Sequence, residues 1–306
     1  MAGELRPAPP ALPLNRDIQF TYGVPDEVSP LVRRVVAHNP NPFTFTGTGT
    51  HLIGEDEVAV VDPGPDLADH VDALIAAIGG ATVSHILVTH THRDHSPAAR
   101  LLQQRTGAPT YGWGPHPAGT VSDRRVEEGG DTDFVPDVTV DHGDVVRGNG
   151  WTIECLHTPG HISNHVCYAL VDENGLFTGD HVMGWSTSVV SPPEGRMGDY
   201  LRSLELLLTR DDVIYWPTHG PPVRDPKTLV RAFIAHRHHR EDQILDCLAA
   251  DRTTIDAMVP VIYADVAPEL HPAAARSTYA HLLHLVETGL VRSDGEPSPS
   301  SRYWPS

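Results

Sequence analysis

Four side chains of types that commonly bind metals lie within six residues: His90, His92, Asp94 and His95. Side chains alternate along an extended segment, so His90 and His92 are expected to point the same way and hold one ion. Asp94 and His95 follow as the chain turns into the next predicted helix, where they can face a second ion. Imidazole nitrogen and carboxylate oxygen are ligands that zinc favours. The spacing therefore predicts a metal centre, although a chance cluster is the alternative in a chain with 20 histidines.

Three further candidate ligands follow later predicted strands, each beside a glycine: His161, Asp180 and His219. Each alone would be an ordinary turn residue. Together with the first cluster they predict two groups, which are His90, His92 and His161 for one ion and Asp94, His95 and His219 for the other, with Asp180 as the bridge. One shared water or hydroxide would leave coordination positions open for substrate, as in a catalytic rather than a structural site.

Such a centre is typical of metal-dependent hydrolysis. Two divalent ions lower the pKa of a shared water from ~15.7 toward ~7, so a bridging hydroxide is available at neutral pH. We expect Asp94 to be the catalytic residue that holds the nucleophile in place and carries a proton. Zinc is the expected metal, with manganese and iron as alternatives.

The elements that must position these ligands are short apolar runs followed by turns. Strands are predicted at 58–61, 86–88, 151–156, 166–171 and 213–216, and helices at 67–78, 96–104 and 199–208. The candidate ligands lie where several of these strands end, in loops of the kind that carry binding sites. Residues 107–147 are rich in Gly, Pro and Asp, which predicts loops with short strands.

From about Lys227 the pattern becomes almost entirely helical. Helices are predicted at 228–250, 255–263 and 277–288, followed by a polar tail rich in Ser and Pro. Three helices and a short β-turn region suggest a winged-helix module. We therefore expect a catalytic domain at residues 1–228 and a winged-helix-like domain at 229–306. The basic segment from Arg231 to Arg240 is interpreted as a solvated helix face.

Composition narrows the class of protein. With 22 basic and 40 acidic residues the net charge is −18, which disfavours broad binding to nucleic acid. Cys155, Cys167 and Cys247 are too few and scattered for a disulfide framework and fit a reducing compartment. The first 14 residues have neither a basic nor an apolar segment of a signal peptide, and no apolar run approaches a membrane span. These features predict a cytoplasmic protein without a membrane partner, and nothing indicates an oligomeric state.

The order of candidate ligands resembles that of the metallo-β-lactamase-fold hydrolase superfamily. Other stretches are similar to its β-lactamase-like protein 2 branch; they are residues 39–50, 62–64, 179–204 and 235–241. The resemblance, from about residue 35 to 292, implies an α+β fold, a four-layer αββα sandwich with two metals at one edge and a C-terminal winged helix. It also implies that Asp62 supports the ligand loops from behind.

The substrate is less determined, because one fold and metal site serve many reactions. The branch includes single-stranded-RNA endonucleases and thioesterases acting on acyl carriers, and the superfamily includes other thioesterases and lactonases. A nucleic-acid reader should show a basic stripe, but the last helix offers only Arg276, His281 and His284. We therefore expect ester or thioester hydrolysis of a small-molecule or acyl-carrier substrate. The alternative is an endoribonuclease on single-stranded RNA.

Two further alternatives are disfavoured. A β-lactamase of one large subclass would have Cys in place of Asp180 and would be exported. A winged-helix DNA-binding metal sensor would need a closed metal site. Among other residues near the ligands, His116 is a candidate substrate contact, His165 either lines the pocket or has a hydrogen-bonded structural role, and Arg93 is expected to brace a loop.

Overall fold

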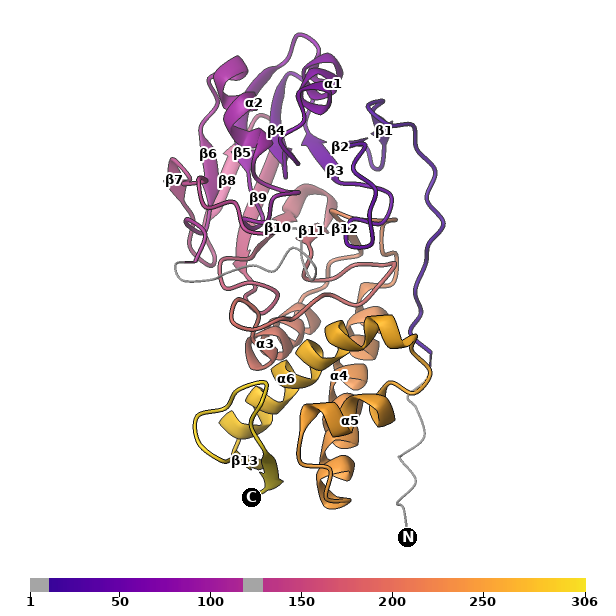
Figure 1. Cartoon of the computed structure of the whole chain (residues 1–306). Coiled ribbons are helices and arrows are strands. Elements are labelled where there is room, and N and C mark those ends of the chain that lie inside the picture. The colour runs from indigo at the N-terminus through magenta and orange to yellow at the C-terminus, as the bar shows by residue number, and fades with distance from the viewer. Residues whose placement is uncertain (1–10, 118–128) are drawn as a thin grey trace.

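The computed structural model describes residues 11–117 and 129–306 (Figure 1). Two sheets face each other in its upper part. The first has the strand order β1-β2-β3-β4-β5-β6-β7, and the second has the order β12-β11-β10-β9-β8. The first sheet consists of β1 (Asp26–Glu27), β2 (Val32–Val36), β3 (Gly49–Ile53), β4 (Glu57–Val61), β5 (Thr82–Leu87), β6 (Thr110–Gly112) and β7 (Val138–Thr139). The second consists of β8 (Val145–Gly148), β9 (Trp151–His157), β10 (Val166–Leu170), β11 (Gly175–Gly179) and β12 (Ile214–Pro217).

Helices cover the outer faces of both sheets, because each sheet has apolar residues on both sides. The helices α1 (Ala68–Ile78) and α2 (Ala98–Thr106) pack on the first sheet through a cluster that includes Val60, Leu74 and Leu102. Helix α3 (Met197–Leu208) packs on the second sheet through a separate cluster. A third cluster, with Trp151 and Phe177, fills the space between the sheets. These layers confirm the predicted αββα sandwich.

Three helices and a hairpin follow the sandwich. They are α4 (Pro226–Ala249), α5 (Ile255–Ile262), α6 (His271–Glu287), β13 (Val291–Ser293) and β14 (Tyr303–Pro305). Asp225 caps α4 by accepting from the Thr228 amide, and Thr254 caps α5 in the same way. Helix α6 begins six residues before the predicted start.

The predicted polar tail is only partly correct. Strand β14 pairs with β13, and the side chain of Tyr303 is completely buried in the C-terminal core. The hairpin completes the winged-helix module. Helix α3 of the sandwich contacts both α4 and α6, so the C-terminal helices are continuous with one outer layer of the sandwich (Figure 1).

An N-terminal segment runs along the side of the molecule, past the C-terminal helices toward the first sheet (Figure 1). Within it, the Asn15 amide donates to the Gly184 carbonyl over 2.8 Å, and Arg16 Nε donates to the Trp185 carbonyl over 3.4 Å. Across the part of the chain that the structure describes, no helix is long and apolar enough to span a membrane.

Candidate metal centre

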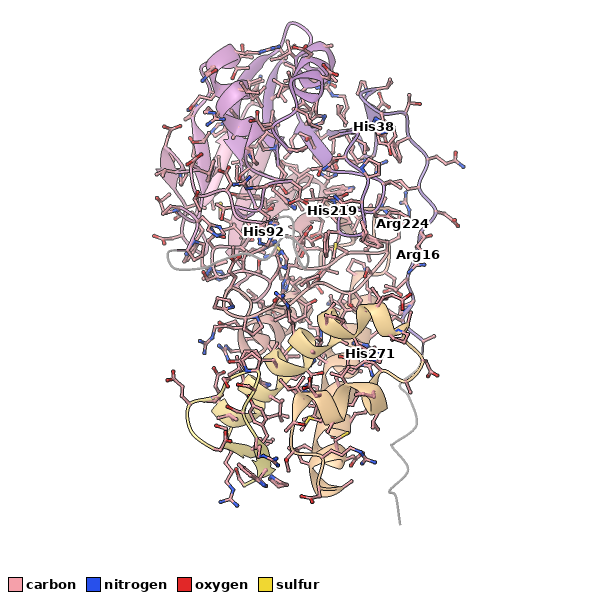
Figure 2. All side chains as sticks on the ribbon, in the orientation of Figure 1. Arg16, His38, His92, His219, Arg224 and His271 are labelled. Carbon is pink, nitrogen blue, oxygen red and sulfur yellow. The ribbon has the colours of Figure 1, made fainter. Side chains whose placement is uncertain are left out.

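All seven predicted ligands come together at one end of the sandwich. The residues follow the ends of four strands: His90, His92, Asp94 and His95 after β5, His161 after β9, Asp180 after β11, and His219 after β12. Figure 2 places His92 and His219 where the sandwich meets the C-terminal helices. The side chains form two groups in which the potential ligand atoms lie within 4.8 Å of one another.

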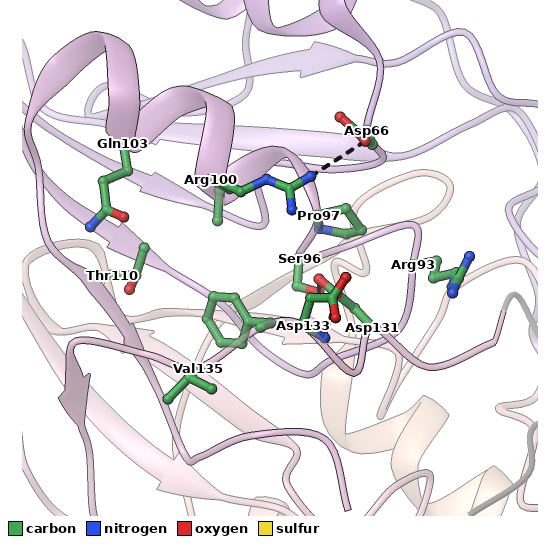
Figure 3. Close-up of a pocket in the computed structure, with 12 residues that line it drawn as sticks. Asp66, Arg93, Ser96, Pro97, Arg100, Gln103, Thr110, Asp131, Asp133 and Val135 are labelled. Carbon is green, nitrogen blue, oxygen red and sulfur yellow. Dashed lines mark hydrogen bonds and ion pairs between the residues drawn. The ribbon is translucent and has the colours of Figure 1, made fainter.

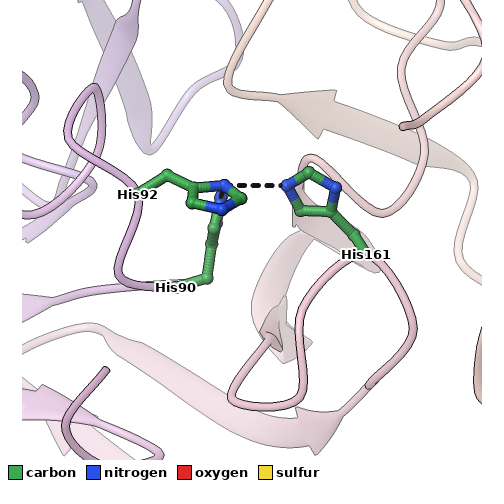
Figure 4. A group of neighbouring side chains, drawn as sticks. All are labelled: His90, His92 and His161. Carbon is green, nitrogen blue, oxygen red and sulfur yellow. Dashed lines mark hydrogen bonds between the residues drawn. The ribbon is translucent and has the colours of Figure 1, made fainter. Parts of the chain in front are cut away.

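The first group consists of His90, His92 and His161, all buried (Figure 4). His90 Nε2 lies 2.9 Å from His92 Nδ1, and His161 Nε2 lies 3.0 Å from the same atom. Three imidazole nitrogens thus point at one position. They come from two loops, so the group exists only because β5 and β9 end at the same edge.

The second group consists of Asp94, His95, Asp180 and His219, also buried. His219 Nε2 lies 3.0 Å from Asp94 Oδ2 and 3.4 Å from Asp180 Oδ1. His95 Nε2 lies 3.5 Å from Asp94 Oδ2 and 3.6 Å from Asp180 Oδ1. The other carboxylate oxygen of Asp180, Oδ2, lies 3.9 Å from His161 Nε2 in the first group. Asp180 is therefore placed between the two groups.

In each of the five histidines, one ring nitrogen points toward the other ligands (the inner nitrogen), and the other ring nitrogen (the outer nitrogen) contacts the surrounding protein. His90 Nδ1 meets Thr89 Oγ1, and His161 Nδ1 meets the Val189 carbonyl. His95 Nδ1 meets Asp62 Oδ2, and His219 Nδ1 meets the Gly47 carbonyl. His92 uses its other ring nitrogen, Nε2, which meets Glu194 Oε2. When the outer nitrogen is the donor, the inner nitrogen has a lone pair and no proton. Five such lone pairs directed at two positions form the donor set of a divalent cation.

Several inner atoms also lack a hydrogen-bond partner. His95 Nε2, His219 Nε2, Asp94 Oδ1 and Asp180 Oδ1 are buried without one. Buried polar atoms are nearly always satisfied, so four unsatisfied atoms in one cluster need an explanation. Metal ions at the two positions would satisfy His95 Nε2, His219 Nε2 and Asp180 Oδ1, and a water beside them would satisfy Asp94 Oδ1.

Burial and neighbouring charge shift the pKa values of the two groups in opposite directions. Burial and the surrounding imidazoles hold the pKa of His90 well below its usual value, which keeps the ring neutral, as a metal ligand must be. Burial also lowers the pKa of His95, but Asp94, Asp62 and Asp180 outweigh it and hold that pKa well above its usual value. Burial likewise raises the pKa of Asp94, yet His95 and His219 hold it well below. The charged forms of His95 and Asp94 are therefore both favoured in the second group.

Asp62 supports the ligand loops from behind. Its Oδ2 accepts hydrogen bonds from His95 Nδ1, Thr89 Oγ1 and Thr218 Oγ1 over 2.7–2.8 Å, and its Oδ1 accepts from the Thr89 amide over 2.8 Å. Asp62 has a φ of 49°, in the left-handed region, at the turn after β4. One carboxylate thus joins the loops after β4, β5 and β12.

Glu194 was not identified from the sequence. It lies in the loop before α3, and its carboxylate meets His92 Nε2 at 3.3 Å and His116 Nε2 at 3.5 Å. No local pattern marked it, because the contact joins loops about 100 residues apart. The side chain of His116 is 3% exposed and also bonds to Thr91 Oγ1, so it faces Glu194, and His116 is not among the residues that line the pocket at the metal groups.

A pocket opens directly onto the two groups. Its lining includes four candidate ligands, His92, Asp94, His161 and Asp180. The remaining lining residues come from two loops; they are Pro42, Phe43, Met183, Trp185, Ser186, Thr187 and Val189. The second of these loops, residues 181–190, is called the wall loop below. The ring of Trp185 is stacked on Phe45 at 4.8 Å, so a second aromatic ring supports this apolar side of the pocket.

Other predicted residues have structural roles. His165 binds Thr158 Oγ1 over 2.9 Å and accepts from the Asp180 amide over 3.3 Å, so its hydrogen-bonded role is confirmed. Arg93 Nε donates to the Gly130 carbonyl over 3.0 Å, which confirms that it braces a loop. The prediction of a solvated face from Arg231 to Arg240 was wrong for Arg237, which is only 4% exposed.

A second hollow lies beside α2, and its lining includes Arg93 and Ser96 from the segment after β5 that carries four candidate ligands (Figure 3). Its charged residues are partly engaged with one another or with nearby backbone: Arg100 pairs with Asp66 at 3.7 Å, and Ser96 donates to Asp131 over 2.7 Å. None of the seven candidate ligands lines it. We therefore place the chemistry at the pocket with the two groups.

Comparison with known proteins agrees with this geometry. Residues 45–219 match the model of the metallo-beta-lactamase superfamily, and residues 254–304 match the beta-lactamase associated winged helix domain. The chain therefore belongs to the metallo-beta-lactamase superfamily, carries the associated winged helix, and is a hydrolase.

Individual relatives have low sequence identity to this chain. The chain is 29% identical over 229 residues to the lactamase-like protein notP of an Aspergillus species, a match that covers 73% of this chain and 65% of that protein. It is 28% identical over 249 residues to the atrochrysone carboxyl ACP thioesterase of Claviceps purpurea, covering 78% and 74%. A beta-lactamase domain protein from Burkholderia ambifaria has the same fold, with a TM-score of 0.77, 21% identity, and coverage of 96% and 98%.

Proposed function

We propose that the chain is a dinuclear metallohydrolase that cleaves acyl esters or thioesters, including acyl groups attached to a carrier thiol. In the thioester reaction, water and the thioester give a free carboxylic acid and a free thiol. His90, His92 and His161 would hold one ion, and Asp94, His95 and His219 the other, with Asp180 between them. Zinc suits the nitrogen and oxygen donors, and manganese and iron remain alternatives. When bound, the ions would lower the pKa of water and stabilise developing negative charge.

Asp94 is the proposed catalytic residue. Its Oδ2 faces His219 and His95, whereas its Oδ1 is buried without a hydrogen-bond partner. The free oxygen is placed to accept a proton from the attacking water and to hold it toward the substrate carbonyl. Asp94 also lines the pocket, so it can contact the reacting atoms.

The apolar lining of the pocket is the observation that carries the substrate class. Phe43, Met183, Trp185 and Val189 are next to the ligands, and no Lys or Arg is among the described residues that line this pocket. An apolar wall beside a metal centre suits an acyl group, whose carbonyl is uncharged before attack. A phosphodiester would bring fixed negative charge to a protein of net charge −18.

The names of the relatives support the same class. The Claviceps purpurea protein is called an ACP thioesterase, and a protein of Aspergillus terreus with 28% identity has the same name. Both matches extend over about three quarters of this chain. We infer that an acyl thioester on a carrier protein or small thiol is the substrate to test first.

The test is metal-dependent turnover of an aromatic acyl thioester of N-acetylcysteamine and of a labelled single-stranded RNA. The wild type and the Asp94→Asn variant are compared, with Asp133→Asn as the control because Asp133 is exposed and outside the pocket. We expect thioester cleavage by the wild type and the control, and a loss in Asp94→Asn. RNA cleavage that Asp94→Asn abolishes, without thioester cleavage, would contradict the proposal.

A further inference from the structure

One buried arginine of the C-terminal helices reaches the supports of the metal ligand His161. Arg237 lies in α4, and its Nη2 donates to the Ser188 carbonyl over 2.5 Å. Ser188 belongs to the wall loop, and the next residue, Val189, has the carbonyl that accepts from His161 Nδ1 over 2.7 Å. The guanidinium is thus one peptide unit away from the bond that sets the orientation of the His161 ring.

Arg237 also contacts the support of the His161 backbone. Its guanidinium carbon lies 5.1 Å from the centre of the Tyr200 ring. Tyr200 in α3 is in direct contact with the His161 loop: a Cβ on Gly160 would come within 2.3 Å of the Tyr200 Cα atom. The Arg196 amide, at the start of α3, donates to the Gly160 carbonyl over 2.9 Å. The backbone and the ring of His161 therefore have two different supports, and Arg237 touches both.

The same contacts converge on a second carbonyl of the wall loop. Ser188 Oγ donates to the His181 carbonyl over 2.8 Å, and Tyr200 Oη donates to it over 3.0 Å. His181 directly follows the candidate ligand Asp180. Arg237, Tyr200 and Ser188 thus hold both ends of the wall loop, near Asp180 at its start and near the His161 contact at its end.

An ion pair does not account for the burial of Arg237. Among the described residues, none provides a carboxylate within ion-pair distance of its guanidinium, although it is only 4% exposed. A buried charge without such a partner costs desolvation free energy, so stability alone does not explain its position. Its polar contacts are instead directed at the wall loop and Tyr200.

We propose that Arg237 is a positioning residue, through which the C-terminal helices fix His161 in the geometry needed to bind an ion together with His90 and His92. The inference rests on the metal centre of the proposed function and does not depend on which acyl substrate is cleaved. It gives the C-terminal helices a role at the active site that involves no nucleic acid. Partners of metal-binding histidines commonly change metal affinity by 10–100-fold when they are removed.

The experiment measures metal affinity in the metal-free full-length chain, by Zn²⁺ competition with a chromophoric chelator and by the visible absorption of bound Co²⁺. Arg237→Gln removes the charge and the reach to Ser188. We expect it to weaken one of the two binding steps at least 10-fold, to leave the other within about threefold, and to change the Co²⁺ spectrum. Arg237→Lys keeps a charged donor and should recover part of the affinity.

Two controls separate positioning from a general loss of stability. Ile244→Val, two turns later in α4, removes packing from a buried side chain whose core cluster contains no residue of the wall loop. It should lower the melting temperature but leave both affinities unchanged. Arg231→Gln, on the exposed side of the same helix, should change neither.

A double-mutant cycle with His161→Ala tests the route of the effect. If Arg237 acts through His161, Arg237→Gln adds less than twofold to the loss of metal affinity in the His161→Ala background. Equal effects in both backgrounds, or the same loss of affinity in Ile244→Val, would overturn the proposal. If Arg237→Gln does not fold, Arg237→Met replaces it, because Met has a long side chain without a donor, and wild-type affinities in that variant would overturn the proposal as well. A wild type that binds no ions would instead contradict the proposed function itself.

Discussion

At the scale of single residues, the site depends on carboxylates that each serve several partners. Asp94 faces two histidines with one oxygen and has the other oxygen free. Asp62 accepts four hydrogen bonds from three different residues. Because Asp62 is completely buried, water cannot replace the hydrogen bonds that it accepts.

For Asp94→Asn we expect kcat/KM to fall about 10²–10⁴-fold, the range of a lost proton-transfer group. The amide keeps the size of the side chain but cannot accept the proton. The assay uses saturating metal, with the bound metal measured on the same sample. Near-normal turnover with both metals bound would remove Asp94 from the catalytic role.

For Asp62→Asn we expect both stability and metal affinity to fall. The amide nitrogen cannot accept the hydrogen bonds made by His95, Thr89 and Thr218, so buried donors are left unpaired at a cost of about 1–3 kcal/mol each. His95 also loses the partner that orients it, so metal affinity should drop about 10–100-fold. Urea denaturation of the metal-free chain measures the first effect, and chelator competition measures the second. Unchanged values for both would contradict the supporting role of Asp62.

At the scale of elements, strand ends position the ligands and two loops form the substrate side of the pocket. The candidate ligands could be picked out from the sequence because each follows an apolar run that had to be a buried strand, and their role as metal ligands stays a prediction. Phe43 and Trp185 could not, because they lie in irregular segments without periodicity. The burial of Arg237 could have been predicted from helical spacing, because it lies four residues after Phe233, a core residue, and so on the same face of α4.

For Trp185→Ala we expect the KM for an apolar acyl thioester to rise about 10-fold or more, because a large apolar contact to the acyl group is lost. The effect should be smaller for a short acetyl thioester, which cannot reach the side chain. Comparing acyl chain lengths in steady-state kinetics checks this. Equal losses for both chain lengths would show that Trp185 acts on the metal centre and does not select the acyl group.

At the scale of the whole molecule, the C-terminal helices are joined by a buried carboxylate. Glu241 of α4 meets His284 of α6 at 2.7 Å, His281 of α6 at 3.5 Å and His238 of its own helix at 3.0 Å. The residues after 228, which we propose form a separate winged-helix-like domain, thus have an ionic contact between their main helices. His281 and His284 are engaged in this contact, so neither is free to contribute to the basic stripe that a nucleic-acid reader needs.

This contact should make stability depend on pH. The hydrogen bond that His284 donates to Glu241 raises the pKa of His284, whereas burial and Arg237 lower the pKa of His281 to about 4 despite Glu241. Burial raises the pKa of Glu241, but hydrogen bonds from His281 and His284 outweigh it and hold that pKa well below its usual value. The His284 contribution is therefore complete below its unfolded pKa near 6.5 and is lost as pH rises through the higher folded value. The Glu241 contribution is lost on acidification below about 4.5.

For His284→Asn we expect a larger fall in melting temperature at pH 6 than at pH 8.5, because a larger fraction of His284 is charged at the lower pH. His142→Asn, at an exposed loop position, is the control and should show no such difference. Thermal unfolding of the metal-free chain at the two pH values measures both. An equal effect of His284→Asn at the two pH values would mean that packing, and not charge, joins α4 to α6.

The central claim is that seven buried side chains hold two ions that the reaction needs. Metal removal followed by titration tests it most directly, with bound metal and thioester turnover measured on the same samples. We predict that the metal-free chain is inactive and that turnover returns in proportion to added metal until two ions are bound per chain. Full activity in a chain from which all metal has been removed, or saturation at one ion per chain, would contradict this account.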